Sequence, residues 1–236
     1  MEGRERVGGE PAGKAGQRVR EDAQITIEEP RRFVSRGGEK LEAALEAFAI
    51  DVRTLHVLDV GASTGGFTDC LLQRGAAQVT AVDVGYGQLD WRLRNDSRVT
   101  VMERVNFRRL GDDAFPNGFD LTVIDASFIS LRTILARAVR YLRGGGVIVA
   151  LVKPQFEAGR ERVGTGGVVR DRATHRTVLR EVRAGALELG LVPVRLTESP
   201  LTGPAGNREF LVELRWSGDA FDDARLEAVL GEESRT

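Results

Sequence analysis

The sequence predicts an α/β fold in which helices cover both faces of a mostly parallel sheet. Short apolar runs of the kind that form buried strands alternate with stretches whose apolar residues recur at helical spacing. This alternation is typical of strands joined by crossover helices, which lie on both faces of the sheet. Charged residues end several of the runs, and ligands of such sheets bind outside the carboxyl ends of the strands. These charged residues are Asp59, Asp83, Asp125 and Lys153.

Each expected element follows from its own apolar pattern. Strands are expected at residues 57–60, 79–84, 99–102, 121–124, 147–152, 192–197 and 210–214, after a short strand that ends at residue 27. Helices are expected at residues 40–50, in a stretch that ends at Leu72, and at residues 131–142 and 172–189. The glycines at residues 144–146 are expected to break the chain. The predicted organisation is a polar segment with a linker at residues 1–30, an α/β domain at residues 31–217 and an acidic tail at residues 218–236.

Composition excludes several classes of protein. The formal net charge of −1 over 236 residues excludes a broadly basic coat for nucleic acid, so any contact with RNA must come from a local patch. The single cysteine, Cys70, excludes a disulfide framework, and no cluster resembles a metal site. No apolar run is long enough for a transmembrane helix, and the N-terminus has no apolar core of a secretion signal. We therefore expect a cytoplasmic protein that holds no metal and does not insert into membranes.

Lysine is rare in this chain, and two of its positions are candidates for chemistry. Arginine supplies nearly all the positive charge, and lysine occurs only at Lys14, Lys40 and Lys153. Lys40 and Lys153 stand in glycine- or proline-flanked stretches. Arginine stays protonated in proteins, whereas a lysine can be tuned to lose its proton. Lys40 and Lys153 are therefore candidates for ammonium or amine chemistry.

A glycine-rich loop indicates a nucleotide-like ligand. Residues 61–66, GASTGG, follow an expected strand and precede an expected helix. Glycines permit a tight turn and close approach of a ligand, and the helix N-terminus offers unpaired N–H groups. Asp83 lies about twenty residues downstream at the end of the next strand, where a carboxylate accepts hydrogen bonds from ribose hydroxyls. The two features together favour an adenosine-containing ligand.

Other interpretations of this loop remain open. A nicotinamide-binding loop prefers a third-position glycine, where this chain has Ser63. The pattern around Ser63 also matches the nucleophile elbow of α/β-hydrolases, with Asp125 and His175 following in the order of a triad. That elbow normally follows several strands, whereas this loop follows the first convincing strand of the sheet. A glycine-rich turn without any ligand is the third alternative.

Six segments together resemble the TlyA (hemolysin A) family of ribosomal RNA 2′-O-methyltransferases, which is related to the FtsJ-like enzymes. They are VSRGGEKL at residues 34–41, LDVGASTGGFTD at 58–69, AVDVGYGQL at 81–89, IDASFISL at 124–131, LVKPQFE at 151–157 and SPLTGPAGNREF at 199–210. The resemblance implies a class I (Rossmann-like) methyltransferase fold with a seven-stranded sheet. It also implies S-adenosylmethionine as methyl donor and the ribose of cytidine in ribosomal RNA as substrate.

The resemblance assigns roles to individual residues. A catalytic set falls on Lys40, Asp125, Lys153 and Glu209. The expected cofactor contacts are Asp59, Gly61, Ser63, Thr64, Gly65, Gly66, Phe67, Asp83, Asn106 and Asp125. Lys153 is expected to act as general base in its neutral form, with nearby Lys40 lowering its pKa by like-charge repulsion. Asp125 would orient Lys153, and Glu209 would hold Lys40 or the substrate hydroxyl.

The family usually begins with an S4 RNA-binding domain, and here only its end is recognisable, at residues 7–27. Docking to the ribosome therefore depends on a remnant and on local arginines. The candidates for phosphate contacts are Arg36, Arg160, Arg162, Arg170, Arg172 and Arg176. The alternatives for function are a membrane-active hemolysin, a binding module without catalysis, and a methyltransferase acting on protein or a small molecule.

Overall fold

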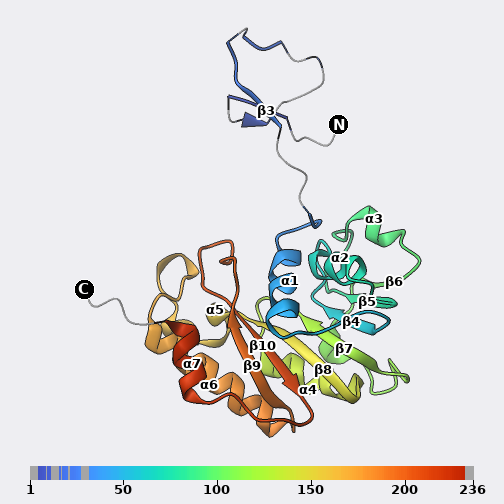
Figure 1. Ribbon diagram of the computed structural model, residues 1–236, viewed down its shortest axis with the longest axis vertical. Coiled ribbons are helices and arrows are strands. Elements are labelled where there is room, and N and C mark those ends of the chain that lie inside the picture. The colour runs from blue at the N-terminus through green and yellow to red at the C-terminus, as the bar shows by residue number, and fades with distance from the viewer. Residues whose placement is uncertain are drawn as a thin grey trace. The chain divides into compact units, whose positions relative to one another are not determined.

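The computed structural model describes residues 5–8, 10, 11, 16, 18–20, 22–27 and 32–231, and it divides into two units (Figure 1). The first unit, residues 1–32, contains a small antiparallel sheet of order β2-β1-β3. Its strands are β1 (Glu5–Val7), β2 (Glu10–Pro11) and β3 (Ile25–Ile27). The strand expected to end at residue 27 is β3, whereas β1 and β2 were not expected. The assignment of this unit to an S4 remnant stays a prediction.

The second unit, residues 33–236, is built on a seven-stranded sheet of order β6-β5-β4-β7-β8-β10-β9. Its strands are β4 (His56–Val60), β5 (Gln78–Val82), β6 (Val99–Met102), β7 (Phe119–Ile124), β8 (Leu142–Val152), β9 (Val192–Glu198) and β10 (Phe210–Arg215). The β6-to-β8 neighbours pair in parallel, and β10 pairs antiparallel with both β8 and β9. The predicted fold class, a mostly parallel sheet of seven strands, is confirmed.

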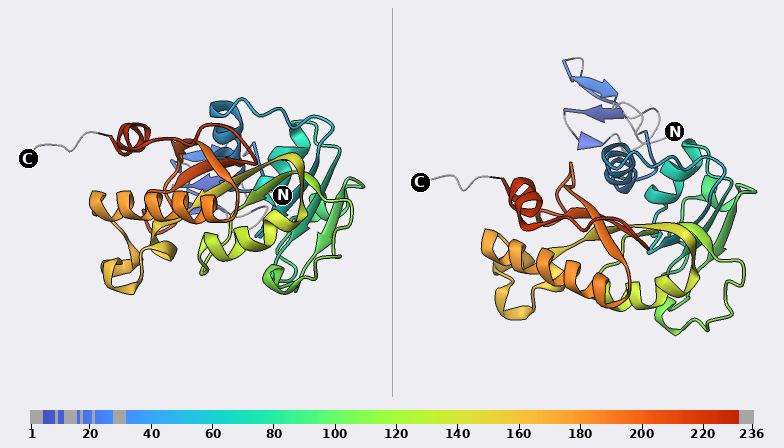
Figure 2. Two further views of the ribbon diagram at one scale, coloured as in Figure 1. Left: turned by 90° about the horizontal axis from the view of Figure 1, so that it is seen from below. Right: turned by 60° about the horizontal axis from the view of Figure 1, so that its bottom comes forward.

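Helices cover the two faces of this sheet (Figure 2). The α-helices are α1 (Gly37–Ala47), α2 (Gly66–Gln73), α3 (Trp91–Arg94), α4 (Leu131–Ala138), α5 (Pro154–Glu157), α6 (Arg172–Glu188) and α7 (Asp223–Leu230). Short 3₁₀ turns are η1 (Phe107–Arg109), η2 (Val139–Tyr141), η3 (Arg160–Arg162) and η4 (Thr165–Gly167). No helix of the described residues is long and apolar enough to cross a membrane.

The core is split in two by the sheet. Alternate side chains of a strand point to opposite faces, so Leu58 and Val60 pack in one cluster with α4 and α6, while Val57 packs in the other with α1 and α2. This burial on both faces explains why the strands appear in the sequence as continuous apolar runs. It also fixes the sheet's register, so the residues that follow each strand are held at a common edge.

Three expectations differ from the structure. The helix expected at residues 131–142 is α-helical only to Ala138 and continues as η2. The glycines at residues 144–146 lie inside β8, in the register shift between the pairs that Leu142 and Val147 form with β7, and β10 pairs with β8 only at residues 147–152. The expected acidic tail at residues 218–236 contains α7, which belongs to the second unit since Leu226 and Leu230 are buried in its core.

Candidate active site

The glycine loop joins β4 to α2 and is tied to the end of β5. Gly61 has φ +86°, and a Cβ there would lie 2.6 Å from the carbonyl oxygen of Asp125, so no other residue fits without displacing the backbone. Ser63 N donates a 2.8 Å hydrogen bond to Asp83 Oδ2, and Gly85 N donates one of 2.7 Å to Asp83 Oδ1. Asp83 therefore holds two loops at the carboxyl edge of the sheet.

A cavity of about 470 Å³ opens between these loops. Its volume is in the range of sites for small molecules and cofactors. Among the predicted site residues, those that line it are Gly61, Ser63, Asp83, Asn106 and Asp125. Further lining residues include Gln88, Phe107, Ser127, Phe128 and Ile129.

Lys153 and Asp125 form an ion pair at this cavity. Lys153 follows β8 and begins α5, and its Nζ lies 2.6 Å from Asp125 Oδ1. The same nitrogen donates a 2.8 Å hydrogen bond to Ser127 Oγ. The helix α5 is itself held in place, since Glu157 accepts hydrogen bonds of 2.9 Å from Ser130 Oγ and 2.7 Å from Leu131 N at the start of α4. Lys153 does not itself line the cavity, but its amine is held by Asp125 and Ser127, which do.

A second lysine–carboxylate pair stands beside the first. Lys40, in the first turn of α1, forms a short ion pair with Glu209, and the two side chains are only 9% and 1% exposed. The β8–β10 register pairs Val152 with Phe210. Continued by one residue, this register places Lys153 opposite Glu209. The four residues of the predicted catalytic set are therefore brought together as two adjacent ion pairs.

Comparison with known proteins identifies the family. The model of the FtsJ-like methyltransferases matches residues 33–216. The chain belongs to the FtsJ-like methyltransferase family. It is accordingly a methyltransferase, and its methyl donor is S-adenosylmethionine.

Individual relatives of this FtsJ-like chain cover most of its length. It is 49% identical over 219 residues to the 16S/23S rRNA (cytidine-2′-O)-methyltransferase TlyA of Mycobacterium tuberculosis. This alignment covers 92% of this chain and 82% of that protein. It is 40% identical over 195 residues to Hemolysin A of Brachyspira hyodysenteriae, covering 82% and 81%. A solved structure from Streptococcus thermophilus, described as a hemolysin, superposes with a TM-score of 0.81 at 44% identity, covering 97% of this chain and 85% of the other.

The cavity of this FtsJ-like chain fits S-adenosylmethionine. The missing Cβ of Gly61 lets the loop backbone lie against that of Asp125 at the cavity, and the carboxylate of Asp83 is placed to accept hydroxyl hydrogen bonds. Asp125, the second acidic residue of the wall, suits a ligand that carries positive charge. Within the described ranges no group of three or more His, Cys, Asp or Glu residues is arranged to hold a metal ion.

The other half of the predicted cofactor contacts does not line the cavity of the FtsJ-like domain: Asp59, Thr64, Gly65, Gly66 and Phe67. A Cβ on Gly65 would lie 2.2 Å from Leu93 Cδ1, and one on Gly66 would lie 2.2 Å from Ser35 Oγ. These two glycines therefore allow close packing of the loop on its neighbours. Phe67, in the first turn of α2, is buried in the hydrophobic core. Their assignment as cofactor contacts stays a prediction.

Asp59 lies beneath the glycine loop and is fully buried. Its Oδ2 accepts a 2.6 Å hydrogen bond from Thr68 Oγ1, while its Oδ1 has no hydrogen-bond partner in the described part of the chain. Burial, reinforced by the nearby negative charges of Asp125 and Asp83, raises the pKa of Asp59 to about 7. Asp59 therefore supports the loop from below.

Phe128 is a site residue that the sequence analysis missed. It lines the cavity, has φ +63°, and is 89% exposed, with its ring centroid 4.9 Å from that of Phe156. A positive φ is uncommon for a bulky residue and costs free energy, which points to a functional position. The sequence offered one signal for it: an aromatic residue three positions after Asp125, in the segment that follows the end of β7 at the carboxyl edge of the sheet.

The hydrolase interpretation of Ser63 is wrong. Ser63 Oγ lies 3.4 Å from Gln88 Oε1. His175 is buried, its Nε2 pairs with the carbonyl of Val169 at 3.1 Å, and its ring packs on Phe210. Burial also lowers the pKa of His175, as expected for an imidazole in the interior. His175 is therefore not positioned to activate Ser63.

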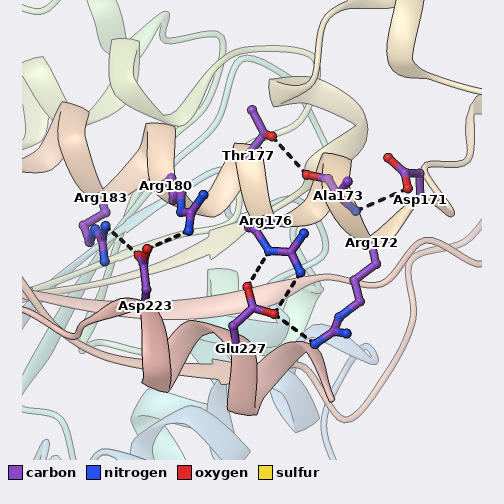
Figure 3. A network of polar contacts seen from close by, with 9 residues as sticks. All are labelled: Asp171, Arg172, Ala173, Arg176, Thr177, Arg180, Arg183, Asp223 and Glu227. Carbon is purple, nitrogen blue, oxygen red and sulfur yellow. Dashed lines mark hydrogen bonds and ion pairs between the residues drawn. The ribbon is translucent and has the colours of Figure 1, made fainter. Parts of the chain in front are cut away.

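Three of the six arginines predicted to contact phosphates have partners in the FtsJ-like domain. Arg36 donates to the carbonyl oxygen of Thr202 at 2.5 Å. Arg172 and Arg176, on α6, both bind the carboxylate of Glu227 on α7 (Figure 3). These two arginines thus hold α7 in place, and Arg160, Arg162 and Arg170 remain as the exposed candidates.

Proposed function

We propose that this chain transfers the methyl group of S-adenosylmethionine to the 2′-hydroxyl of a cytidine in ribosomal RNA. Its relatives support this specificity, since a protein with 49% identity is named as a 16S/23S rRNA (cytidine-2′-O)-methyltransferase. The more general statement, that the substrate is RNA, is supported by the same name and by the family.

The observation that carries the proposal is the pair of lysine–carboxylate contacts beside the cavity. A ribose hydroxyl is a weak nucleophile until it loses its proton, so an enzyme that methylates it needs a positioned base. Lys153 Nζ is fixed by Asp125 and Ser127, two residues that line the cavity. Lys40 of α1 forms an ion pair with Glu209, which directly precedes the neighbouring strand β10.

When bound, S-adenosylmethionine supplies an electrophilic methyl group on a positively charged sulfur. As the proposed base, Lys153 would accept the proton of the ribose 2′-hydroxyl at Nζ, which Asp125 and Ser127 hold in place. The methyl group would pass to the hydroxyl oxygen as the donor's carbon–sulfur bond breaks, and Lys153 would keep the proton. Holding the two reactants in line contributes most of the remaining rate enhancement.

The exposed ring of Phe128 suits an RNA substrate. Aromatic side chains at the mouth of a site stack on unpaired bases, as is usual where proteins read single-stranded RNA. The ring contacts Phe156 but is 89% exposed at the cavity wall, so most of its surface is available to a base.

The test is transfer of a labelled methyl group to ribosomal subunits that lack the modification. A 2′-O-methyl group blocks alkaline cleavage at the next phosphate, so label in alkali-resistant dinucleotides identifies the ribose oxygen as the acceptor. Lys153→Arg keeps the positive charge and removes the base, so we expect at least a hundredfold loss of transfer. Binding of S-adenosylmethionine by calorimetry should be retained in that variant. Label in mononucleotides would contradict ribose methylation, and unchanged transfer by Lys153→Arg would contradict the base assignment.

A further inference from the structure

The loop at residues 159–170 leads directly away from the active site. Lys153 begins α5, α5 ends at Glu157, and Gly159 with φ +79° turns the chain into η3 and η4. The loop's arginines, Arg160, Arg162 and Arg170, are exposed. The loop is thus joined to the catalytic lysine by a single short helix.

These three arginines differ from most arginines of the domain. Arg74, Arg98, Arg137 and Arg180 illustrate the common case, in which a guanidinium is paired with a carboxylate. Within the described ranges no hydrogen bond or ion pair involves the side chain of Arg160, Arg162 or Arg170. Glu161 is the one acidic residue between them, so the loop carries a surplus of positive charge.

A buried asparagine ties this loop to the other half of the site. Asn207 is only 2% exposed, and its Oδ1 accepts a 2.9 Å hydrogen bond from Val169 N. Its Nδ2 donates a 2.9 Å hydrogen bond to the carbonyl oxygen of Gly167. In Figure 1 the two loops involved lie next to each other, in tan and dark orange, to the left of α1.

The loop that carries Asn207 also shapes the surroundings of Glu209. Gly203 N donates to the carbonyl oxygen of Asn207 at 2.8 Å, and a Cβ on Gly203 would lie 2.6 Å from Glu209 Oε1. The carboxylate that pairs with Lys40 is therefore packed against the same loop that holds the arginine-bearing segment. Movement of one segment would displace the other.

We propose that residues 159–170 form an arm that binds phosphates of the substrate RNA next to the modified nucleotide, and that Asn207 holds this arm in register with the Lys40–Glu209 pair. The proposal rests on the proposed function. Guanidinium groups bind phosphate oxygens in bidentate fashion, and such contacts fix the register of a nucleic acid without reading its sequence. Asn207 acts through the arm and the glutamate, so it is a positioning residue.

The first test uses a double variant that carries both Arg160→Ala and Arg162→Ala, and its control is the single variant Arg53→Ala. Arg53 is also an exposed arginine, paired with Asp51 in the turn that precedes β4, at the opposite edge of the sheet from the cavity. Binding to unmodified ribosomal subunits is measured over a series of salt concentrations. We expect the double variant to bind about tenfold more weakly and its salt slope to fall by about 1.4, as for the loss of two contacts to single-stranded phosphates. Arg53→Ala should match the wild type.

The second test is a double-mutant cycle between Asn207→Ala and the two arginine substitutions. If Asn207 positions the arginines, the Asn207→Ala substitution weakens RNA binding by itself. Removing the arginines from the Asn207→Ala variant then adds little further loss of binding. A merely structural asparagine would lower the unfolding temperature and leave the two effects on RNA binding additive.

The outcomes separate this proposal from the proposed function. Absence of methyl transfer to RNA by the wild-type chain overturns both. Normal transfer by the wild type, with RNA affinity and salt slope unchanged in the arginine double variant, overturns the arm alone. Additive effects in the cycle overturn the role of Asn207.

Discussion

The buried pair of Lys40 and Glu209 permits a prediction whose magnitude follows from the structure. Lys40→Met keeps the length of the side chain and removes the ammonium group. Glu209, 1% exposed, then keeps a carboxylate with neither solvent nor its counter-ion. Breaking a buried pair on one side costs about 3–5 kcal/mol, because the remaining charge is uncompensated.

A cost of this size is measurable by urea denaturation. It corresponds to a loss of about a hundredfold to several thousandfold in the folding equilibrium constant. With a denaturant slope of about 1–3 kcal/mol per molar, the midpoint should fall by about 1–5 M with the slope unchanged. Lys153→Met is the matched control, since its pair with Asp125 is more accessible, at 12% and 23% exposure, and should cost less.

The double variant Lys40→Met with Glu209→Met distinguishes burial of charge from loss of packing. Two apolar side chains replace the pair without leaving a charge, so we expect most of the lost stability to return. A midpoint for Lys40→Met equal to that of the wild type or of Lys153→Met would refute the reasoning, because the pair would then behave as solvated.

Three further predictions concern the loop, a buried acid and the last helix. Gly61→Ala should weaken binding of S-adenosylmethionine at least tenfold in calorimetry, since its Cβ would lie 2.6 Å from the Asp125 carbonyl oxygen at φ +86°; unchanged affinity would mean that the loop tolerates displacement. Burial raises the pKa of Asp59 to about 7 against about 4 when unfolded, so its contribution to stability is full below about pH 4 and is lost as pH rises through about 7. Asp59→Asn should flatten stability measured between pH 5 and 8, and an unchanged pH profile would contradict the protonated state. Glu227→Gln removes the ion pairs that join α7 to Arg172 and Arg176. Because the carboxylate is 36% exposed, the loss of stability should be about 1 kcal/mol, or about 2–4 °C in unfolding temperature. A loss several times larger would show that these ion pairs dominate the docking of α7.

Much of the sheet could be predicted from the sequence because its strands are buried on both faces. A continuous apolar run such as residues 147–152 admits few other interpretations when it ends at a charged residue. The glycines at residues 144–146 illustrate the limit. Glycine weakens an isolated strand, yet here β8 continues through these glycines because Leu142, on their N-terminal side, also pairs with β7. Pairing between strands distant in sequence decides this, and no local pattern reports it.

The site was predictable in its residue types and less so in its geometry. The sequence-based hypothesis paired Asp125 with Lys153 and Glu209 with Lys40, and the structure brings both pairs together, while their catalytic roles stay a prediction. A glycine such as Gly65 is equally suited to a ligand and to close packing, so its sequence context could not separate the two. The partners of the α6 arginines are carboxylates on α7, which lie 55 residues along the chain from Arg172 and 43 from Arg180 and come near only when the chain folds.

The most direct test of the central claim is methyl transfer to ribosomal RNA with the position of the methyl group determined. Wild-type protein, labelled S-adenosylmethionine and unmodified subunits should yield label in alkali-resistant dinucleotides that begin with cytidine. Binding of S-adenosylmethionine without any transfer to RNA, or transfer to a base rather than to the ribose oxygen, would contradict the account.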